Sequence, residues 1–233
     1  MGFYRNVKVP DCLFESSNDG DVPDLRLDMQ ATYPELGVIG WGRLNNRNLR
    51  DAKTVHFYNN DQDFSALLSK PQQILSTRAV SAVEPNFSLG KDTPAWFGHY
   101  YIYMKRYIAR LWQEWNVRIY VDLNVSRKFK EANLVGVPLG WRAFANRGYN
   151  GNSAKDLLED YYTAETWAQG KRPFYLVIGG NLDTRNACKR YGWFWIPEAI
   201  QSVKGCHGQR WHQEKDAILT LPKLPKQIKG SGV

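Results

Sequence analysis

Residues 78–125 read RAVSAVEPNFSLGKDTPAWFGHYYIYMKRYIARLWQEWNVRIYVDLNV and have the pattern of a strand, a helix and a second strand. Both ends of the stretch are rich in β-branched and apolar residues, as is typical of buried strands. Thr93 stands at an N-cap position and Pro94 at the first helical position, so the sequence predicts a helix over 94–115. Two buried strands joined by a helix form a parallel βαβ crossover. Functional side chains are therefore expected at the carboxyl ends of the strands.

The predicted helix carries large apolar side chains on one broad face. Steps of about 100° per residue place on this face Trp96, Tyr100, Tyr103, Met104, Tyr107, Ile108, Leu111 and Trp115. The opposite side receives Gly98, Lys105, Arg106 and Gln113. We expect the apolar face to pack against the sheet and the polar side to face solvent.

Strand and helix patterns alternate on both sides of this unit. Strands are predicted at 37–44, 53–58, 134–138, 141–148 and 173–178, and helices at 62–76 and 154–169. The first of these helices contains Pro71, which should break or kink it, and the second stops at Gly170. The alternation predicts a single α/β domain with a mainly parallel sheet of about six or seven strands, covered by helices and open or partly barrel-like.

The two ends of the chain are expected to lie outside this domain. Residues 1–35 are interrupted by Pro10, by the run SSNDGD and by Pro23, which predicts an irregular N-terminal extension. The α/β domain is placed at 36–220. Residues 221–233 are rich in Pro and Lys and are predicted to form a flexible basic tail.

Composition restricts the class of protein. No window approaches the roughly 18 consecutive apolar residues of a membrane span, so no membrane partner is expected. The three cysteines, Cys12, Cys188 and Cys206, are odd in number and scattered, which favours a reducing cytoplasm over a disulfide framework. The net charge of +8 suits an anionic partner, and nucleic acid is the usual one.

Four runs of the sequence are distinctive, namely VHFYNNDQDF at 55–64, EPNFSLGKDTP at 84–94, NVRIYVDLNVS at 116–126 and LVGVPLGWRAFANRGYN at 134–150. The most specific piece is P-N-F-S-L-x-x-D-x-P at 85–94. Over about 54–180 the sequence resembles a family of bacteriophage and mobile-element proteins that is known as a domain of unknown function. The resemblance implies a phage or mobile-element origin and an α/β fold, and therefore the cytoplasm of a bacterial host cell as the location. Asn86 stands where members tend to have Asp, and Asn124 where they tend to have Trp.

Polar side chains follow several predicted strands and are expected to meet at one rim of the sheet. Among them, Glu84, Asp92 and Asp122 offer oxygen ligands that suit Mg²⁺, so they are candidate metal ligands and catalytic residues for phosphodiester cleavage. In the alternative interpretation, Asp92 caps a helix while Glu84 and Asp122 pair with Arg or Lys. Further pocket candidates at the same rim are Asn59, Asn86, Ser88, Asn124 and Asn181.

Basic residues gather in stretches that could contact phosphates. Two of these are the candidate nucleic-acid surface, consisting of Arg127, Lys128 and Lys130, and of Arg185, Lys189, Arg190, Trp193 and Trp195. Arg and Lys neutralise phosphates, and exposed Trp can stack on bases. The alternative is a solvated basic face above a Trp-rich core.

Other chemistries have weaker signals. The pairs Tyr100–Tyr101 and Tyr161–Tyr162 suggest a tyrosine nucleophile, but the closely spaced histidines that hold a metal in such enzymes are missing. Cys206, His207 and His212 lack an evident fourth zinc ligand. The sequence thus predicts a phage or mobile-element protein that acts on nucleic acid, in replication or processing. The alternatives are a metal-dependent phosphodiester hydrolase and a non-enzymatic accessory protein that binds a host or phage protein.

Overall fold

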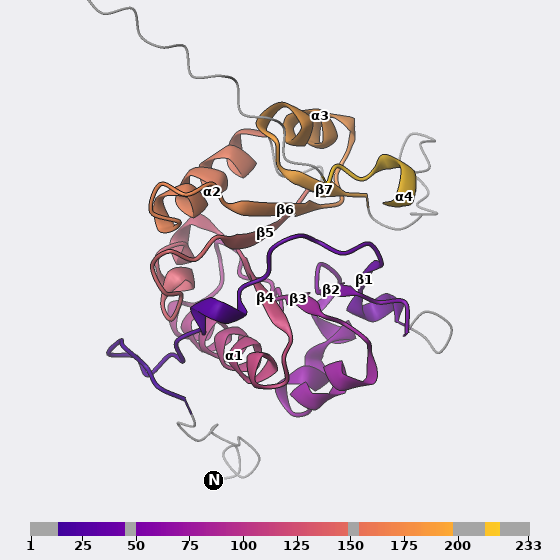
Figure 1. Ribbon diagram of the computed structural model, residues 1–233. Coiled ribbons are helices and arrows are strands. Elements are labelled where there is room, and N and C mark those ends of the chain that lie inside the picture. The colour runs from indigo at the N-terminus through magenta and orange to yellow at the C-terminus, as the bar shows by residue number, and fades with distance from the viewer. Residues whose placement is uncertain (1–13, 45–49, 149–153, 198–212, 220–233) are drawn as a thin grey trace, which may run out of the picture.

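Seven parallel strands form the centre of the protein, shown by a computed structural model that describes residues 14–44, 50–148, 154–197 and 213–219. The strands are β1 (Val38–Gly40), β2 (Thr54–His56), β3 (Ser81–Val83), β4 (Arg118–Asp122), β5 (Ala143–Arg147), β6 (Phe174–Ile178) and β7 (Phe194–Ile196). Their order in the sheet is their order in the chain, so each connection leads to the neighbouring strand. The sheet curves into a nearly closed barrel with helices around its outside (Figure 1). This confirms the predicted α/β domain with a partly barrel-like parallel sheet.

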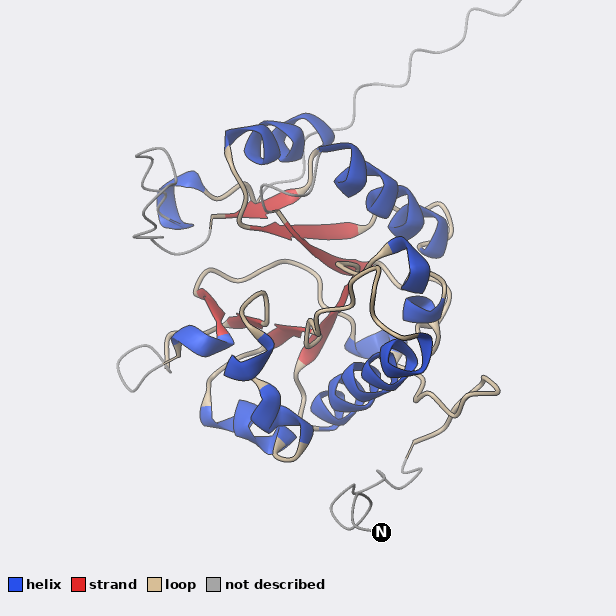
Figure 2. Ribbon diagram, turned by 180° about the vertical axis from the view of Figure 1, so that it is seen from behind, coloured by secondary structure: helices blue, strands red, loops and turns tan. Residues whose placement is uncertain are grey.

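Helices connect the strands on the outside of the barrel (Figure 2). They are α1 (Ala95–Glu114) between β3 and β4, α2 (Ala154–Trp167) between β5 and β6, α3 (Leu182–Tyr191) between β6 and β7, and α4 (Gln213–Asp216) after β7. Asn181 caps α3 by accepting a hydrogen bond from the Thr184 N–H (3.1 Å), and Gly192 ends it in a left-handed conformation (φ 69°). In the described ranges, no helix is both long and apolar enough to cross a membrane.

Two predicted elements take another form. The region predicted as a helix over 62–76 contains 3₁₀ turns, of which the last, Pro71–Ser76, begins at the proline that breaks the pattern. The expected strand at 134–138 is a 3₁₀ turn, Ala132–Leu134, followed by a loop. Gly136 in this loop has a φ of +75°, and a Cβ there would lie 2.4 Å from the carbonyl oxygen of Pro23. The N-terminal segment therefore packs directly against the backbone at Gly136. A side chain at this position would collide with it, and the positive φ of Gly136 is not that of a strand.

The N-terminal segment becomes part of the barrel between β4 and β5. β4 pairs with β3 through Arg118–Tyr120 but with β5 only through Val121 and Asp122. Gln30 and Ala31 occupy the space beside the earlier part of β4, where the Ala31 N–H donates to the Ile119 carbonyl (2.9 Å). The Gln30 Oε1 atom accepts from the Arg142 N–H (2.7 Å), just before β5. We call Gln30 and Ala31 the wedge. It provides hydrogen-bond partners for backbone groups of β4 and of the residue before β5 that these two strands do not provide for each other.

Helix α1 is turned opposite to the expectation. All four residues predicted on its solvent side, Gly98, Lys105, Arg106 and Gln113, are buried. Trp96 and Tyr100, predicted on the core face, are 85% and 45% exposed, whereas Met104 and Ile108 on that face are buried. The prediction was wrong because the polar residues have specific partners inside. Gln113, for example, accepts from the Arg26 N–H (2.8 Å) and donates to the Arg26 carbonyl (3.0 Å).

Candidate functional site

Two carboxylates lie at the carboxyl ends of neighbouring strands, as parallel pairing requires. Glu84 follows β3 and Asp122 ends β4, and both side chains are fully buried. The Asp122 N–H donates to the Glu84 Oε2 atom (3.2 Å), which holds the two carboxylates side by side. The sequence therefore predicted correctly that these residues meet at one edge of the sheet.

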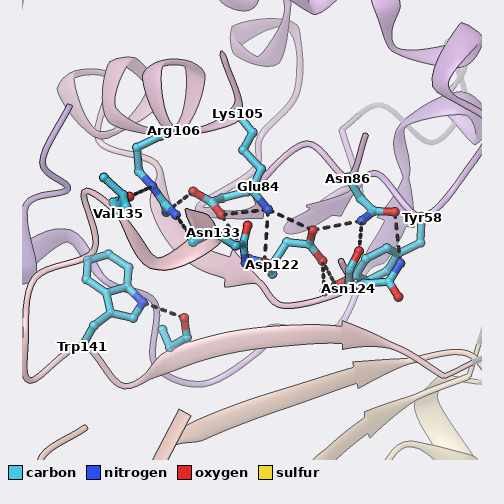
Figure 3. Close-up of polar contacts among 11 residues, drawn as sticks. Tyr58, Glu84, Asn86, Lys105, Arg106, Asp122, Asn124, Asn133, Val135 and Trp141 are labelled. Atoms are coloured by element: carbon cyan, nitrogen blue, oxygen red, sulfur yellow. Dashed lines mark hydrogen bonds and ion pairs between the residues drawn. The ribbon is translucent and has the colours of Figure 1, made fainter. Parts of the chain in front are cut away.

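Two buried cations from α1 accompany these carboxylates (Figure 3). The Lys105 Nζ atom lies 3.3 Å from Asp122 Oδ2 and 3.8 Å from Glu84 Oε2. Arg106 pairs with Glu84 Oε1 and donates to the carbonyl oxygens of Asn133 (2.6 Å) and Val135 (3.1 Å). We call Glu84, Lys105, Arg106 and Asp122 the buried charge cluster. Its two positive and two negative groups balance, which is the condition under which ionic groups can be kept out of water.

Polar side chains from neighbouring strand ends complete the surroundings of Asp122. Its Oδ1 atom accepts from the Tyr58 hydroxyl (3.0 Å) and from the Asn124 N–H (3.0 Å), and its Oδ2 atom accepts from the Asn86 amide (2.9 Å). Burial, together with the nearby Asp122 charge, raises the pKa of Tyr58 well above its ordinary value. The phenol therefore keeps its proton and acts as a donor.

A second polar cluster lies at the end of β5. The Asn146 amide donates to Asp160 Oδ2 (2.7 Å) and to the Tyr175 hydroxyl (3.1 Å), and Lys130 pairs with Asp160 Oδ1 (2.6 Å). Burial raises the pKa of the Asp160 carboxyl, while Lys130 and Asn146 act in the opposite direction. This cluster connects α2 to the sheet.

The predicted metal ligands are only partly brought together. Asp92 is exposed on the turn before α1 and makes no hydrogen bond or ion pair with Glu84 or Asp122. Across the described ranges, no three His, Cys, Asp or Glu side chains are arranged to hold a metal ion. The Lys105 ammonium group lies between Glu84 and Asp122, in the place that a metal ion would need. The two carboxylates therefore pair with Lys and Arg, as the alternative interpretation of the sequence expected.

The other predicted pocket residues have local structural partners. Asn86 and Asn124 belong to the surroundings of Asp122, and Asn181 caps α3. The Ser88 hydroxyl donates to Asp61 Oδ1 (2.9 Å), and the Asn59 side chain lies against the backbone of the turn that follows β1. These five residues therefore hold the ends of strands and helices in place.

The two tryptophans predicted to stack on bases are core residues. Trp193 and Trp195 are 1% and 0% exposed. The Trp193 ring packs against three tyrosines, at 5.0–5.3 Å between centroids, and Trp195 Nε1 donates to the Gly179 carbonyl (2.8 Å). This corrects the expectation: Trp195 lies in β7, which the sequence pattern did not reveal, and Trp193 directly precedes this strand, so both rings enter the core. Neither ring has a face available to a base.

The predicted phosphate-binding cations differ in their surroundings. Lys189 and Arg190 are exposed at the end of α3, and Arg185 is partly exposed 5.9 Å from the Trp195 ring. Lys130 pairs with Asp160, as described above. Arg127 pairs with Glu159 (3.0 Å) but remains 76% exposed, and Lys128 is exposed with its Nζ atom donating to the Thr93 carbonyl (2.6 Å). Cys206, His207 and His212, named above as possible zinc ligands, lie outside the described residues.

The start of α1 presents three exposed aromatic side chains next to Lys128. Trp96, Phe97 and Tyr100 are 85%, 62% and 45% exposed, and we call them the aromatic patch. The 3₁₀ turn Arg127–Phe129 packs against the same part of the helix, because the Phe129 ring occupies the space where Gly98 lacks a side chain. A Cβ on Gly98 would lie 2.1 Å from this ring. The exposed Lys128 is thus held at the end of α1 where the aromatic patch begins.

Sequence reasoning missed several residues that build these sites. Lys105, Arg106, Tyr58 and Asn133 were not predicted to be functional or structural partners of Glu84 and Asp122. One signal was present: Lys105 and Arg106 are adjacent charges in the middle of a helix that is otherwise apolar and aromatic. In the sequence, this helix lies between two strands that each end in a carboxylate. Two adjacent cations in such a helix indicate ion pairs inside the protein.

Replacing Tyr58 with phenylalanine should destabilise the fold by about 1.5–3 kcal/mol, the range for a buried hydrogen bond to a charged group. The change leaves Asp122 Oδ1 with the Asn124 N–H but without its phenol donor. Urea unfolding followed by circular dichroism measures the loss. Tyr162, which is 56% exposed, provides the control, because Tyr162→Phe should change stability by only a few tenths of a kcal/mol. Equal effects of the two changes would contradict the importance of this hydrogen bond.

Fold and geometry together define an α/β protein with a nearly closed parallel barrel and a neutralised charge cluster at its strand ends. A family model described as Domain of unknown function (DUF4417) matches residues 14–144, which is more than half of the chain. The chain therefore belongs to this family, as the resemblance in the sequence predicted. The match extends from the N-terminal segment into β5 and includes the whole buried charge cluster.

Two phage proteins are similar to the chain over a shorter region. It is 28% identical over 110 residues to the Gene 1 protein of Mycobacterium phage D29 and 26% identical over 111 residues to the Gene 1 protein of Mycobacterium phage L5. Each match covers 46% of this chain, and 40% and 47% of the respective relative. The chain thus spans less than half the length of the curated relatives it matches. These matches support the predicted phage origin. No solved structure matches the chain.

Proposed function

We propose that this protein binds nucleic acid through the surface formed by the turn Arg127–Phe129 and the first two turns of α1. The observation that carries the proposal is that the exposed Lys128, whose Nζ atom donates to the Thr93 carbonyl just before α1, lies at the N-terminal end of the helix that presents the aromatic patch, with the exposed Arg127 preceding it in the chain. Cations attract phosphates, and aromatic rings bind bases. The net charge of +8 favours approach of a polyanion to the whole molecule.

The chemistry of the two groups supports a nucleic acid over a small anion. Lys128 is held at the start of α1 by its hydrogen bond to the carbonyl of Thr93, which precedes Trp96 by three residues. A small anion would use the cations alone, whereas a nucleic acid uses both charges and rings. Metal-dependent hydrolysis is not part of the proposed function, because Lys105 and Arg106 neutralise the carboxylates that this reaction would need.

A salt titration tests the proposal. Binding of labelled DNA and RNA oligonucleotides, followed by fluorescence anisotropy, should weaken linearly in log K against log salt. The double change Arg127→Ala and Lys128→Ala should weaken binding and reduce the slope by about 2, one for each phosphate that these cations neutralise. An absence of binding to every oligonucleotide at low salt would refute the proposal.

A matched control separates a local site from general attraction. Lys70 and Lys171 are exposed and lie away from α1's first turns, after the 3₁₀ turn Ser65–Leu68 and after α2 respectively. The double change Lys70→Ala and Lys171→Ala removes the same charge and should leave the salt slope nearly unchanged. If it weakens binding as much as the Arg127 and Lys128 changes do, the proposed surface is not the binding site.

A further inference from the structure

We infer that the nucleic acid bound at this surface is single-stranded, with unpaired bases stacked on Trp96 and Tyr100. The inference rests on the proposed function and names its substrate class. It starts from the orientation of α1, which directs its polar residues inward and places Trp96, Phe97 and Tyr100 at the surface.

The fold does not need aromatic side chains at the positions of the aromatic patch, because other residues orient α1. The inward orientation of α1 is determined by the ion pairs of Lys105 and Arg106 and by the hydrogen bonds of Gln113. Within the described part of the chain, the Trp96 ring has one aromatic neighbour, His99, at 6.0 Å, and remains 85% exposed. A large apolar surface in this position indicates an interaction site.

The spacing of the rings suits bases that are not paired. Trp96 and Tyr100 are four residues apart, so they lie on one face of α1 and about 6 Å apart along its axis, at roughly 1.5 Å per residue. This is nearly twice the roughly 3.4 Å between bases of a stacked strand. Two neighbouring bases can each meet one ring only if the strand is extended and unstacked. In a duplex the flat faces of the bases are covered by their neighbours, so rings on a convex helix do not reach them.

The charges near the patch favour this ligand over an apolar protein segment. Lys128 and Arg127 lie on the turn that packs against α1 at Gly98, and Lys91 is exposed on the loop before α1. These three cations outnumber two nearby carboxylates, Asp92 on the same loop and Glu159, the ion-pair partner of Arg127. A backbone of phosphates would contact these cations while its bases reach the rings, which is the usual combination in proteins that bind single strands.

Fluorescence anisotropy with a labelled single strand and with the duplex of the same sequence, at one low salt concentration, tests the inference. The single strand should bind more tightly than the duplex. Trp96→Ala should weaken single-strand binding by roughly 5- to 150-fold, which corresponds to about 1–3 kcal/mol for one stacked base, and should leave duplex binding nearly unchanged. Trp96→Phe should recover part of the affinity. Trp96 is exposed, so these changes should leave the fold intact.

The control is Tyr162→Ala on α2, since Tyr162 is exposed to a similar degree as Tyr100. It should not affect single-strand binding, whereas Tyr100→Ala should weaken it. If oligonucleotides bind with the expected salt dependence but the duplex binds as tightly as the single strand, or Trp96→Ala has no effect, the inference is wrong and the proposed function stands. If no oligonucleotide binds, the proposed function itself fails. A Trp96→Ala change that abolishes binding of a protein partner but not of oligonucleotides would also overturn the inference.

Discussion

Replacing Arg106 with methionine should destabilise the protein by about 3–5 kcal/mol, the loss expected when one partner of a buried ion pair is removed. Arg106 is fully buried, and burial lowers the pKa of its guanidinium, although Glu84 and Asp122 favour the charged form. The change leaves the Glu84 carboxylate without its nearest cation and removes the donors to the carbonyl oxygens of Asn133 and Val135. Urea unfolding curves give the free energy directly.

Two further variants identify the cause of this loss. Arg110 lies one turn later on α1 and is 15% exposed, but its partner Glu114 is 42% exposed and stays in contact with water when the pair is broken, so Arg110→Met should cost less than about 1 kcal/mol. Adding Glu84→Gln to Arg106→Met should restore part of the stability, because the buried negative charge is removed with its partner. If Arg106→Met is no more harmful than Arg110→Met, the buried charge cluster does not hold α1 to the sheet.

Replacing Trp195 with alanine should cost about 3–5 kcal/mol, the range for removing a large aromatic side chain from a core. The Trp195 ring is fully buried in β7, and its loss also leaves the Gly179 carbonyl without the indole donor. Trp96→Ala is the matched control, since the same chemical change at an 85% exposed position should alter stability by less than about 0.5 kcal/mol.

For binding, the order of the two variants should be reversed: the variant that loses stability should keep its affinity, and the stable variant should lose it. Under conditions where both are folded, Trp195→Ala should retain affinity for oligonucleotides, whereas Trp96→Ala should lose affinity for a single strand. Thermal unfolding and anisotropy on the same preparations provide both measurements. If Trp195→Ala is as stable as the unchanged protein, its placement in the core is contradicted.

The alternation of strands and helices could be predicted because it depends on local patterns. The apolar runs that became β2, β4 and β6 and the long helix α1 were each found within a few residues of their ends. Glu84 and Asp122 could be placed together because neighbouring parallel strands end at a common edge. β7 was missed, since FWI between a charged helix and Pro197 is too short to show a period.

The orientation of α1 could not be predicted from its pattern alone. Periodicity locates the aromatic face, but it does not show that Lys105 and Arg106 have carboxylate partners 17 to 22 residues away in sequence. Partner contacts override the general preference for apolar residues inside, because cations paired in this way can be buried. For the same reason Trp96, which the pattern assigned to the core, lies at the surface. Trp193 and Trp195, expected at the surface, lie in the core, because Trp195 belongs to β7 and Trp193 directly precedes it.

The wedge has a consequence for how the chain reaches its native state. Ala31 is bonded to Ile119 and Gln30 to Arg142, and the second of these hydrogen bonds spans 112 residues. As the polypeptide emerges from the ribosome, Gln30 and Ala31 appear long before these partners, and closing so large a loop is slow. Until it closes, β4 and β5 expose unpaired backbone to other nascent chains. Aggregation during synthesis is therefore expected to depend on when Gln30 and Ala31 dock.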